Sequence, residues 1–581
     1  MSYFDDASLV MIPSGYKTSK VYSVKPTDGT GDLTFTRSND TATRVGPDGL
    51  IEKVRTNLAA YSEQFDNAYW SKSNITVTAN STTNPINGAT TADTLTCTGV
   101  ASGFLNKQIA QTGIVTFSIF AKAGTTDLVR LNTYDGSTDR GAIYNLTTGA
   151  VSGAYGSPLF TLAQSFGNGW YRISIAVNAA SYSDCQVHID SVNSVIIYGA
   201  QLETGDIATD YIATTTAAVS VGPVANVPRL DYLNSSCPKL ILEGQRTNLA
   251  NWSEQANQYT KVGATIGSNV VTSPDGYTNA DSIIEDGSTG GHAFYNFGIT
   301  TFSAVPYTAS IFAKKGGRNW FSLSLYDGTQ GFNAFFNLNT GVVGTVTAGA
   351  TTTITNYGNG WYRCTITATT LAGSTGGIAI YSANADSTNS YAGTNGLTAG
   401  YFYGWQLEVG AYATSYIPTL GAAVTRGVDF AKKENIAGTL PTAYPFTIFA
   451  ESDFYLGSDD FALSFIDITT TNTYYTVGTF GNKYIGVARS SAGEIVATSS
   501  VNYTAGMNKV AAVFTSNSIK VFANGALVAT ATNTLSFTSS VNDLIVGTLR
   551  EGADLGTRNS AKQILVFPSA LSDADAIALT A

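Results

Sequence analysis

Charged residues are scarce in this sequence: Asp, Glu, Lys and Arg make up 12% of its 581 residues, and the acidic excess gives a net charge of −10. A nucleic-acid-binding surface needs an excess of basic residues, so this balance argues against a nucleic acid partner. No apolar run approaches the roughly 18 residues of a membrane-spanning helix, and we expect no membrane insertion. The acidic start, MSYFDDASLVMIPSGYK, is not typical of a signal peptide.

Cysteine and histidine are rarer still, with 4 and 2 residues. The cysteines form no C-x-x-C pair, which argues against zinc ribbons and redox motifs, and we interpret them as reduced and mostly buried thiols. A hydrolase of the Ser-His-Asp or Cys-His type would need His188 or His292 as its base. These two histidines do not correspond in the repeat described next, and we interpret both as structural. The sequence therefore predicts no catalytic residue, no metal ligand and no cofactor.

The hexapeptide GNGWYR occurs twice, at Gly167–Arg172 and at Gly358–Arg363, although the chain has 6 Trp in all. Matching strings flank both copies in the same order: RTNLAAYSEQ and RTNLANWSEQ, FSIFAKAG and ASIFAKKG, NLTTGAV and NLNTGVV, GAQLETG and GWQLEVG, TDYI and TSYI. The offset between the matching strings stays at 191–192 residues and then rises to 205, where the second copy carries the loop-like stretch SANADSTNSYAGTNGLTAG. The chain therefore contains a tandem duplication, and each copy should fold around its own core.

Within each copy, apolar residues alternate in the pattern of a half-buried β-strand. Tyr171 and Ile173 fall on one face, whereas Trp170 and Arg172 fall on the other. Pairs such as Asp135-Gly136 mark hairpin turns, because Gly accepts a positive φ without a Cβ clash. Many short strands with such turns predict an all-β fold of tandem antiparallel β-sandwiches of jelly-roll type.

The repeat divides the chain into five segments. They are an unrepeated polar segment (1–50), the first module (51–217), a proline-punctuated connector (218–245), the second module (246–420) and a C-terminal unit (421–581). Because a free polar terminus usually frays, we expect residues 1–50 to be held in place by a partner.

The C-terminal unit has its own pattern. Asn524-Gly525 predicts a hairpin turn, and Ser572–Thr580 predicts a short helix capped by Ser572 or Asp573. Its strings VFANGALV and FPSALSDADAIALT resemble concanavalin A-like (laminin-G-like) domains. That resemblance implies a third sandwich.

Three longer strings carry a second resemblance: LTFTRSNDTATRVGPDGLIEKVRTNLAAYSEQFDNAYW, PRLDYLNSSCPKLILEGQRTNL and QLEVGAYATSYIPT. From Ser2 to Pro418 the chain resembles phage virion fibre and appendage proteins, both head spikes or fibres and tail-associated carbohydrate-binding proteins. The resemblance implies a virion component built from tandem sandwich modules. It brings no catalytic site and leaves head and tail locations open.

The outer residues of the two hexapeptides, Trp170 with Arg172 and Trp361 with Arg363, are the candidate ligand-binding residues. An indole beside a guanidinium offers a flat apolar surface and hydrogen-bond donors, which suit a sugar ring and its hydroxyls. The alternative is structural: the Trp covers an open end of the sandwich and the Arg stacks over it.

Two pairs of carboxylates recur in both copies, Glu63 with Glu254 and Glu203 with Glu408. Glycoside hydrolysis needs two carboxylates ~5–10 Å apart, so these are the candidates for catalysis. We favour the competing interpretation, in which they hold turns or neighbouring backbone. A structural Ca²⁺ would also use oxygen ligands, but the sequence has no compact Asp/Asn loop and we assign no ligands.

These observations predict a structural component of a phage virion, a head or tail fibre or appendage that displays carbohydrate-binding-like sandwiches for attachment to host-surface glycan. Residues 1–50 would anchor it to other virion proteins. We expect a homo-oligomer, with a trimer favoured by analogy with phage fibres. The alternative function is a virion polysaccharide depolymerase of the glycoside hydrolase class.

Overall fold

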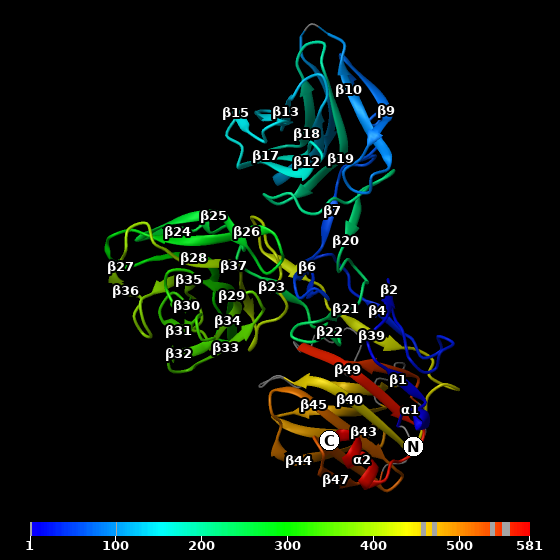
Figure 1. The fold of residues 1–581 in the computed structure, drawn as a ribbon. Coiled ribbons are helices and arrows are strands. Elements are labelled where there is room, and N and C mark those ends of the chain that lie inside the picture. The colour runs from blue at the N-terminus through cyan, green and yellow to red at the C-terminus, as the bar shows by residue number, and fades with distance from the viewer. Residues whose placement is uncertain (1–2, 100, 455–460, 467–472, 535–540, 549–557) are drawn as a thin grey trace. The chain divides into compact units, whose positions relative to one another are not determined.

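The computed structural model describes residues 3–99, 101–454, 461–466, 473–534, 541–548 and 558–581. Nearly all of its regular structure is antiparallel β-strand (Figure 1), which confirms the prediction of tandem β-sandwiches. The chain forms two compact units: unit 2 comprises residues 54–222, and unit 1 comprises 1–53 together with 223–581. Unit 2 is therefore inserted into the chain of unit 1.

Unit 2 is the first module. The apolar residues of its alternating strands, Ile173 and Ile175 among them, form the core between its two sheets. In spatial order the first sheet is β16 (Phe160–Gly167), β17 (Trp170–Ala179), β12 (Gly113–Ala123), β19 (Ser194–Thr204), β10 (Thr90–Cys97) and β9 (Ile75–Thr83). The second sheet is β15 (Val151–Tyr155), β14 (Asp139–Asn145), β13 (Leu128–Tyr134), β18 (Ser183–Ile189), β11 (Gly103–Ile109) and β8 (Ser71–Ser73).

A two-strand stem closes unit 2. Strand β7 (Arg55–Asn57) pairs with β20 (Val219–Val221), so the chain enters and leaves the unit on adjacent antiparallel strands. The second module has the same stem, in which β23 (Arg246–Asn248) pairs with β38 (Val424–Arg426).

The second module repeats this sandwich within unit 1. One sheet, in spatial order, is β24 (Thr260–Val262), β28 (Ala293–Thr301), β35 (Thr375–Ala383), β30 (Trp320–Tyr326), β31 (Gly331–Asn337) and β32 (Val342–Val346). The other is β25 (Ala264–Thr272), β26 (Thr278–Glu285), β37 (Thr398–Val409), β29 (Pro306–Lys315), β34 (Trp361–Thr369) and β33 (Ala350–Asn356). The extra residues of this copy include β36 (Ser390–Ala392), which pairs with β27 (Thr289–Gly291) beside the sandwich. The short helix η1 (Ala256–Gln258) follows the stem.

The C-terminal sandwich recruits strands from three parts of the chain. One sheet is β21 (Arg229–Asp231), β22 (Lys239–Glu243), β49 (Arg558–Phe567), β40 (Phe446–Phe454), β45 (Gly506–Phe514), β46 (Ser518–Ala523) and β47 (Ala526–Thr532), with β1 (Leu9–Met11) also on β49. The other is β2 (Tyr16–Lys17), β3 (Lys20–Val21), β4 (Leu33–Thr36), β39 (Phe430–Lys433), β48 (Asp543–Val546), β41 (Phe461–Ile466), β42 (Tyr474–Phe480), β43 (Lys483–Ser490) and β44 (Gly493–Asn502).

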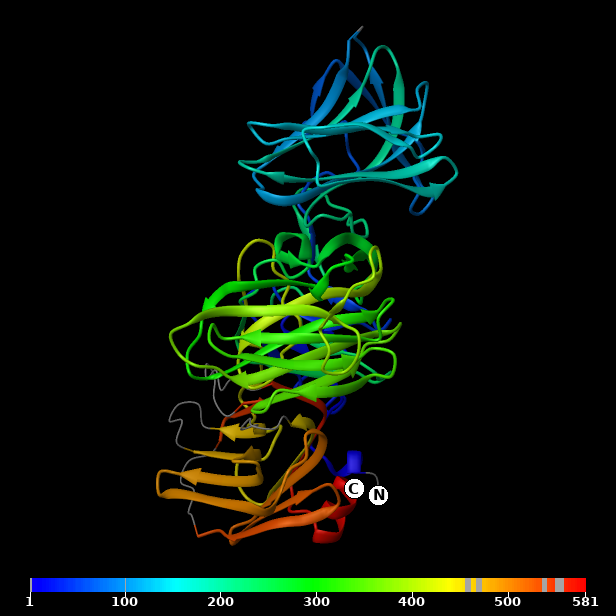
Figure 2. The ribbon, with the colours of Figure 1, turned by 90° about the vertical axis from the view of Figure 1, so that its left-hand side faces the viewer.

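The N-terminal segment and the connector therefore belong to this sandwich, whereas the sequence analysis separated both from it. Leu9 pairs with Val566, and Leu240 of the connector pairs with Ala561. Both views place helix α1 (Tyr3–Asp6) beside α2 (Asp573–Thr580) (Figures 1 and 2), and the Tyr3 hydroxyl donates to the Asp575 carbonyl at 3.2 Å. We expected a partner to hold this segment in place, but within the described residues 3–50 it is held by strand pairing inside the chain. Whether they also contact another virion protein stays a prediction.

Local predictions for the C-terminal unit are confirmed. Asn524 and Gly525 have φ of 47° and 81° and join β46 to β47 as a two-residue hairpin. Ser572 caps α2, because its hydroxyl accepts from the Asp575 N–H at 3.2 Å. None of the helices that the structure describes has the length and apolarity needed to cross a membrane.

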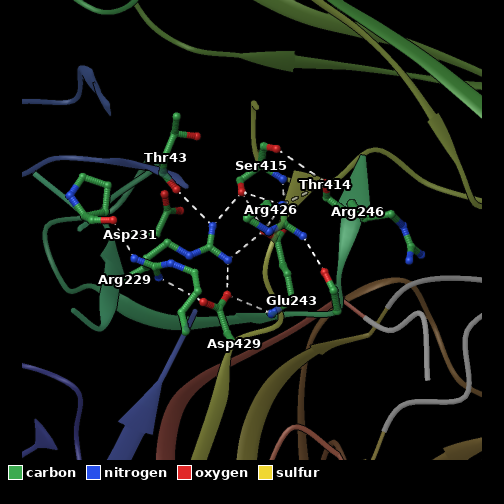
Figure 3. Close-up of polar contacts among 12 residues, drawn as sticks. Thr43, Arg229, Asp231, Glu243, Arg246, Thr414, Ser415, Arg426 and Asp429 are labelled. Atoms are coloured by element: carbon green, nitrogen blue, oxygen red, sulfur yellow. Dashed lines mark hydrogen bonds and ion pairs between the residues drawn. The ribbon is translucent and has the colours of Figure 1, made fainter. Parts of the chain in front are cut away.

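A buried ion network connects the second module to the C-terminal sandwich within unit 1 (Figure 3). Arg229 donates to Glu243 at 2.8 Å and also to Asp429, while Arg426 lies 3.0 Å from Glu243 and Arg37 lies 3.0 Å from Asp429. All five side chains are fully buried. Burial opposes the charge of Arg229, but Asp429 and Glu243 outweigh it and raise its pKa.

Neutral partners complete the network. Arg229 also donates to the Thr43 carbonyl at 3.0 Å, and the Ser415 N–H donates to Glu243 at 2.8 Å. Arg37 donates to the Pro223 carbonyl at 2.5 Å. The network thus ties together the N-terminal segment, the connector, the last turn of the second module and the start of the C-terminal sandwich.

Candidate functional site

The two GNGWYR turns present their Trp and Arg residues in the same way. Gly167, Asn168 and Gly169 have φ of 78°, 50° and 78°, so the chain passes through the left-handed region and enters β17 with Trp170 as its first residue. Tyr171 packs against the core between the sheets, whereas Trp170 belongs to a separate cluster. The alternation predicted from the sequence is therefore correct.

The candidate ligand residues are nevertheless buried. Trp170 and Arg172 are 3% and 6% exposed, and Trp361 and Arg363 are 2% and 5% exposed. Trp170 packs with Phe120 and Tyr198. A ring covered in this way has no free face for a sugar, so the glycan hypothesis for these four residues does not agree with the structure.

The two arginines hold the same outer face together. Arg172 donates to Ser118 Oγ at 3.0 Å and to the Thr209 carbonyl, and its guanidinium lies 5.3 Å from the centre of the Phe120 ring. Arg363 donates to Ser310 Oγ at 3.0 Å and lies 5.3 Å from the Phe312 ring. Each Arg thus stacks on a Phe of the neighbouring strand instead of the Trp that the structural alternative named.

Glu203 and Glu408 hold a turn. Glu203 accepts from Gln201 Nε2 at 2.7 Å and from the Thr209 N–H at 3.0 Å. Glu408 accepts from Gln406 Nε2 and from the Thr414 N–H at 2.7 and 2.8 Å. Both carboxylates are buried, and burial raises the pKa of Glu203. Their contacts are those expected of turn-holding residues.

Glu254 lies in a polar cluster on the outer face of the second module. Lys53 Nζ donates to its two oxygens at 2.9 and 3.0 Å and lies 2.8 Å from Asp275. The Tyr403 hydroxyl lies within hydrogen-bond distance of both carboxylates, 2.9 Å from Glu254 and 2.8 Å from Asp275. Tyr416 also donates to Glu254, at 2.9 Å. Burial alone would lower the pKa of Lys53, but the two carboxylates outweigh it and raise that pKa.

Lys53 reaches this cluster from the hairpin of β5 (Thr43–Val45) and β6 (Ile51–Lys53). Two residues earlier, Ile51 packs among Phe312, Trp361 and Tyr416. The hairpin therefore covers the outer face of the second module with one apolar side chain and one ammonium group.

Glu63 occupies the equivalent place in the first module. Within the described part of unit 2, it accepts from Tyr198 at 2.6 Å and from Tyr211 at 3.1 Å and has no ion-pair partner. The residue equivalent to Asp275 is the uncharged Asn87, whose Oδ1 accepts the Ala89 N–H at 3.0 Å as Asp275 Oδ1 accepts the Tyr277 N–H, and Phe166 of the same face is 40% exposed. We call Glu63, Leu162, Phe166 and Tyr211 the open face.

Sequence reasoning missed Lys53 and the difference between the two modules. The signal was present in the repeat, because SPDG of the second copy (273–276) aligns with NPING of the first (84–88), in which Ile86 is an extra residue and the uncharged Asn87 stands in place of Asp275. Nothing local, in contrast, indicates that Lys53 would bind 201 residues away.

The histidines lie apart from these faces. His188 is 8% exposed and contacts Arg130 at 3.0 Å, and burial followed by Arg130 lowers its pKa to about 4. His292 is fully buried and its Nδ1 donates to the Gly263 carbonyl at 2.6 Å. Among the residues that the structure describes, no three His, Cys, Asp or Glu side chains gather in a metal-binding arrangement.

An edge groove of about 370 Å³ opens on the C-terminal sandwich. It is lined by Tyr484, Ser500, Val501, Asn502, Thr504, Ala523, Asn524, Ala526, Leu527 and Val528. Its base is fixed: Asn524 Nδ2 donates to Asn508 Oδ1 at 2.8 Å, and the Tyr484 hydroxyl donates to the same oxygen at 2.7 Å. Exposed Val501 and Leu527 stand beside hydroxyl and amide groups.

Comparison with known proteins gives no match to a family model and no match to a curated protein sequence. Among solved structures, the chain is similar to the Ruminococcus gnavus IT-sialidase CBM40, at 18% identity and a TM-score of 0.22, covering 24% of this chain and 84% of that one. It is also similar to the CBM22-1-CBM22-2 tandem domain of Paenibacillus barcinonensis Xyn10C, at 12% identity and a TM-score of 0.19, covering 61% and 98%. Domains LG4-5 of the mouse laminin alpha1 chain give 9% identity, a TM-score of 0.18 and coverage of 49% and 92%.

Proposed function

We propose that this protein is a structural appendage of a phage particle that displays β-sandwich modules for attachment to glycan on the host surface. The virion part of the proposal is supported by the sequence resemblance described above. The attachment part is carried by one observation, the edge groove of the C-terminal sandwich.

The groove has the size and the chemistry that a glycan needs. Its volume of about 370 Å³ falls in the usual range for small-molecule sites, ~300–1,000 Å³. A sugar presents hydroxyl groups at its edges and C–H groups on its faces. Asn502 and Thr504 can exchange hydrogen bonds with the former, and Val501 and Leu527 can pack on the latter.

The base of the groove favours binding because it is organised before a ligand arrives. Asn508 Oδ1 accepts hydrogen bonds from the Tyr484 hydroxyl and from Asn524 Nδ2, and Asn508 Nδ2 donates to the Thr504 carbonyl at 2.9 Å. Rigid polar groups lose little entropy on binding, which improves affinity for a given set of contacts.

We propose no catalytic step. Glu254 and Asp275 are two neighbouring carboxylates, as glycoside hydrolysis requires, but both form an ion pair with the Lys53 ammonium. In the first module the position of Asp275 is Asn87, which has no carboxylate. The contacts of these carboxylates thus support a structural role over the depolymerase alternative.

Binding of the full-length protein to purified host polysaccharide tests the proposal, with new reducing ends assayed in the same samples. We expect saturable binding without new reducing ends, and about tenfold weaker binding for Asn502→Ala combined with Leu527→Ser. Val496→Ser is the matched control, because Val496 and Leu527 are both 42% exposed and Val496 lies outside the groove. New reducing ends, or equal binding by the groove variant, would refute the proposal.

Location on the particle needs a separate experiment. Electron microscopy of phage particles labelled with antibody against residues 421–581 should show label on a head or tail appendage. Unlabelled particles from a preparation that infects its host would contradict the virion assignment.

A further inference from the structure

We infer that the open face of the first module is a docking site for an extended segment of a partner protein, which carries an apolar residue followed two positions later by lysine. The inference is independent of the groove and of glycan binding. It rests on a comparison between two copies of one site, of which the second is filled by the chain itself.

The filled copy shows how such a segment binds, through three contacts. Ile51 packs among the aromatic rings of Phe312, Trp361 and Tyr416. The Ile51 N–H donates to the Pro274 carbonyl at 2.8 Å. Lys53 places its ammonium on Glu254, which also accepts from the two tyrosine hydroxyls.

Each of these partners has a counterpart in the first module. The rings correspond to Phe120, Trp170 and Tyr211, where Phe120 and Tyr211 lie 5.8 Å apart between centroids. Pro274 corresponds to Pro85, and Glu254 corresponds to Glu63, which holds the hydroxyls of Tyr198 and Tyr211 as Glu254 holds their equivalents. The counterparts of all three contacts are therefore present.

The chain does not supply a second copy of the docking segment. In the repeat, GLIEKVRTNL before the first module aligns with LILEGQRTNL before the second, so Leu242 corresponds to Ile51 and Gly244 to Lys53. The latter segment lacks the lysine, and its strand β22 pairs with β49 in the C-terminal sandwich. On our inference, the lysine for Glu63 comes from another chain.

Exposure distinguishes the two copies. Tyr416 is 2% exposed, whereas Tyr211 is partly exposed. Leu162, at 41% exposure, stands where the second module has Thr353, and Phe166 packs edge-on against Phe120 at 4.9 Å. A surface row of large apolar residues around a carboxylate is typical of an interaction site.

The charge balance specifies the occupant. In the second module the Lys53 ammonium contacts two carboxylates, Glu254 and Asp275. In the first module the uncharged Asn87 stands in the place of Asp275, so Glu63 is the one carboxylate of the open face. A single lysine would neutralise the open face. A peptide strand also offers a backbone N–H, which can donate to the Pro85 carbonyl, and an apolar side chain two residues before the lysine. The lysine, the N–H and the apolar side chain together favour a protein partner over a glycan.

A backbone-cyclised peptide of residues 42–54 (ATRVGPDGLIEKV) is the probe, added to the full-length protein. Cyclisation holds the hairpin, because a short isolated hairpin is marginally stable. We expect saturable binding, about tenfold or more weaker when the peptide carries Lys53→Glu, since the charge pair then becomes a repulsion. This change leaves the protein intact, so misfolding cannot explain the loss.

Protein variants locate the site. Glu63→Gln and Phe166→Ser should each weaken binding about tenfold, while Asp190→Asn, an exposed carboxylate of the same unit, should leave it unchanged. Absence of saturable binding at millimolar peptide, or equal affinity for Glu63→Gln, would overturn the inference. Displacement of the peptide from this face by host polysaccharide would overturn the assignment to a protein partner.

Discussion

Replacement of Asp429 by Asn should destabilise unit 1 strongly while leaving unit 2 unchanged. The Asp429 carboxylate accepts hydrogen bonds from Arg37 at 3.0 Å, from Arg229, and from the backbone N–H of Glu243 at 3.1 Å. The side chains of Asp429, Arg37 and Arg229 are fully buried. The Asn side chain has nearly the same volume but no charge. The three guanidinium groups of the network would then face Glu243 as its remaining carboxylate.

The expected cost is about 3–5 kcal/mol, because removal of one partner from a buried ion network leaves an uncompensated buried charge. A surface pair is worth about 0–1 kcal/mol. Glu434→Gln is the matched control: it removes a carboxylate 2.7 Å from Lys432, but Glu434 is 53% exposed.

Differential scanning calorimetry of the full-length protein provides the assay. The transition of unit 1 should shift by several degrees in Asp429→Asn and by much less in Glu434→Gln, and the transition of unit 2 serves as an internal standard. Equal shifts in the two variants would refute the reasoning that burial makes this network a major contribution to stability.

Three further outcomes are expected. Residues 54–222, expressed alone, should fold cooperatively, and the rest of the chain rejoined by a short linker should fold as well, because each unit has its own core; an unfolded circular dichroism spectrum for either would contradict this. Trp170→Ala should lower the stability of unit 2 by about 3–5 kcal/mol in urea unfolding, since the ring is 3% exposed; a change below about 1 kcal/mol would show that the ring is not a packing residue. The stability of unit 2 should fall as pH drops from about 6.5 to about 4, because the unfolded chain protonates His188 before the folded state does; a His188→Gln variant that retains the same slope would contradict this cause.

Local features could be predicted from the sequence because they depend on neighbouring residues. Alternation placed Tyr171 and Trp170 on opposite faces, and Asn524-Gly525 defined a hairpin. Alternation does not reveal what covers the outer face, however. The sequence therefore left two interpretations of Trp170 open, an exposed contact for glycan and a structural covering residue, and the structure shows it buried with Phe120 of β12 and Tyr198 of β19.

Distant pairings could not be predicted in this way. Strand β4 is too short and too polar on its exposed side to specify a partner, and it pairs with β39 almost 400 residues later. The Lys53 site has the same character, since its carboxylates come from two separate parts of the second module. Such contacts follow from the complete topology, and the sequence pattern alone led us to treat residues 1–50 as a separate segment.

Because β1 and β4 pair with strands of the C-terminal sandwich, the parts of the chain must fold in a particular order during synthesis. At ribosomal speeds of ~5–20 residues per second, roughly 20–80 s separate the emergence of β4 from that of β39. Unit 2 can fold in that interval, because its strands all lie between residues 54 and 222. Leu33 and Phe35 of β4 lack their partner strand β39 until it has left the ribosome, and Leu9 and Met11 of β1 lack theirs until the last strand, β49, has emerged, although all four are buried in the finished protein. We therefore expect the nascent chain, more than the finished protein, to depend on chaperones that shield apolar strands.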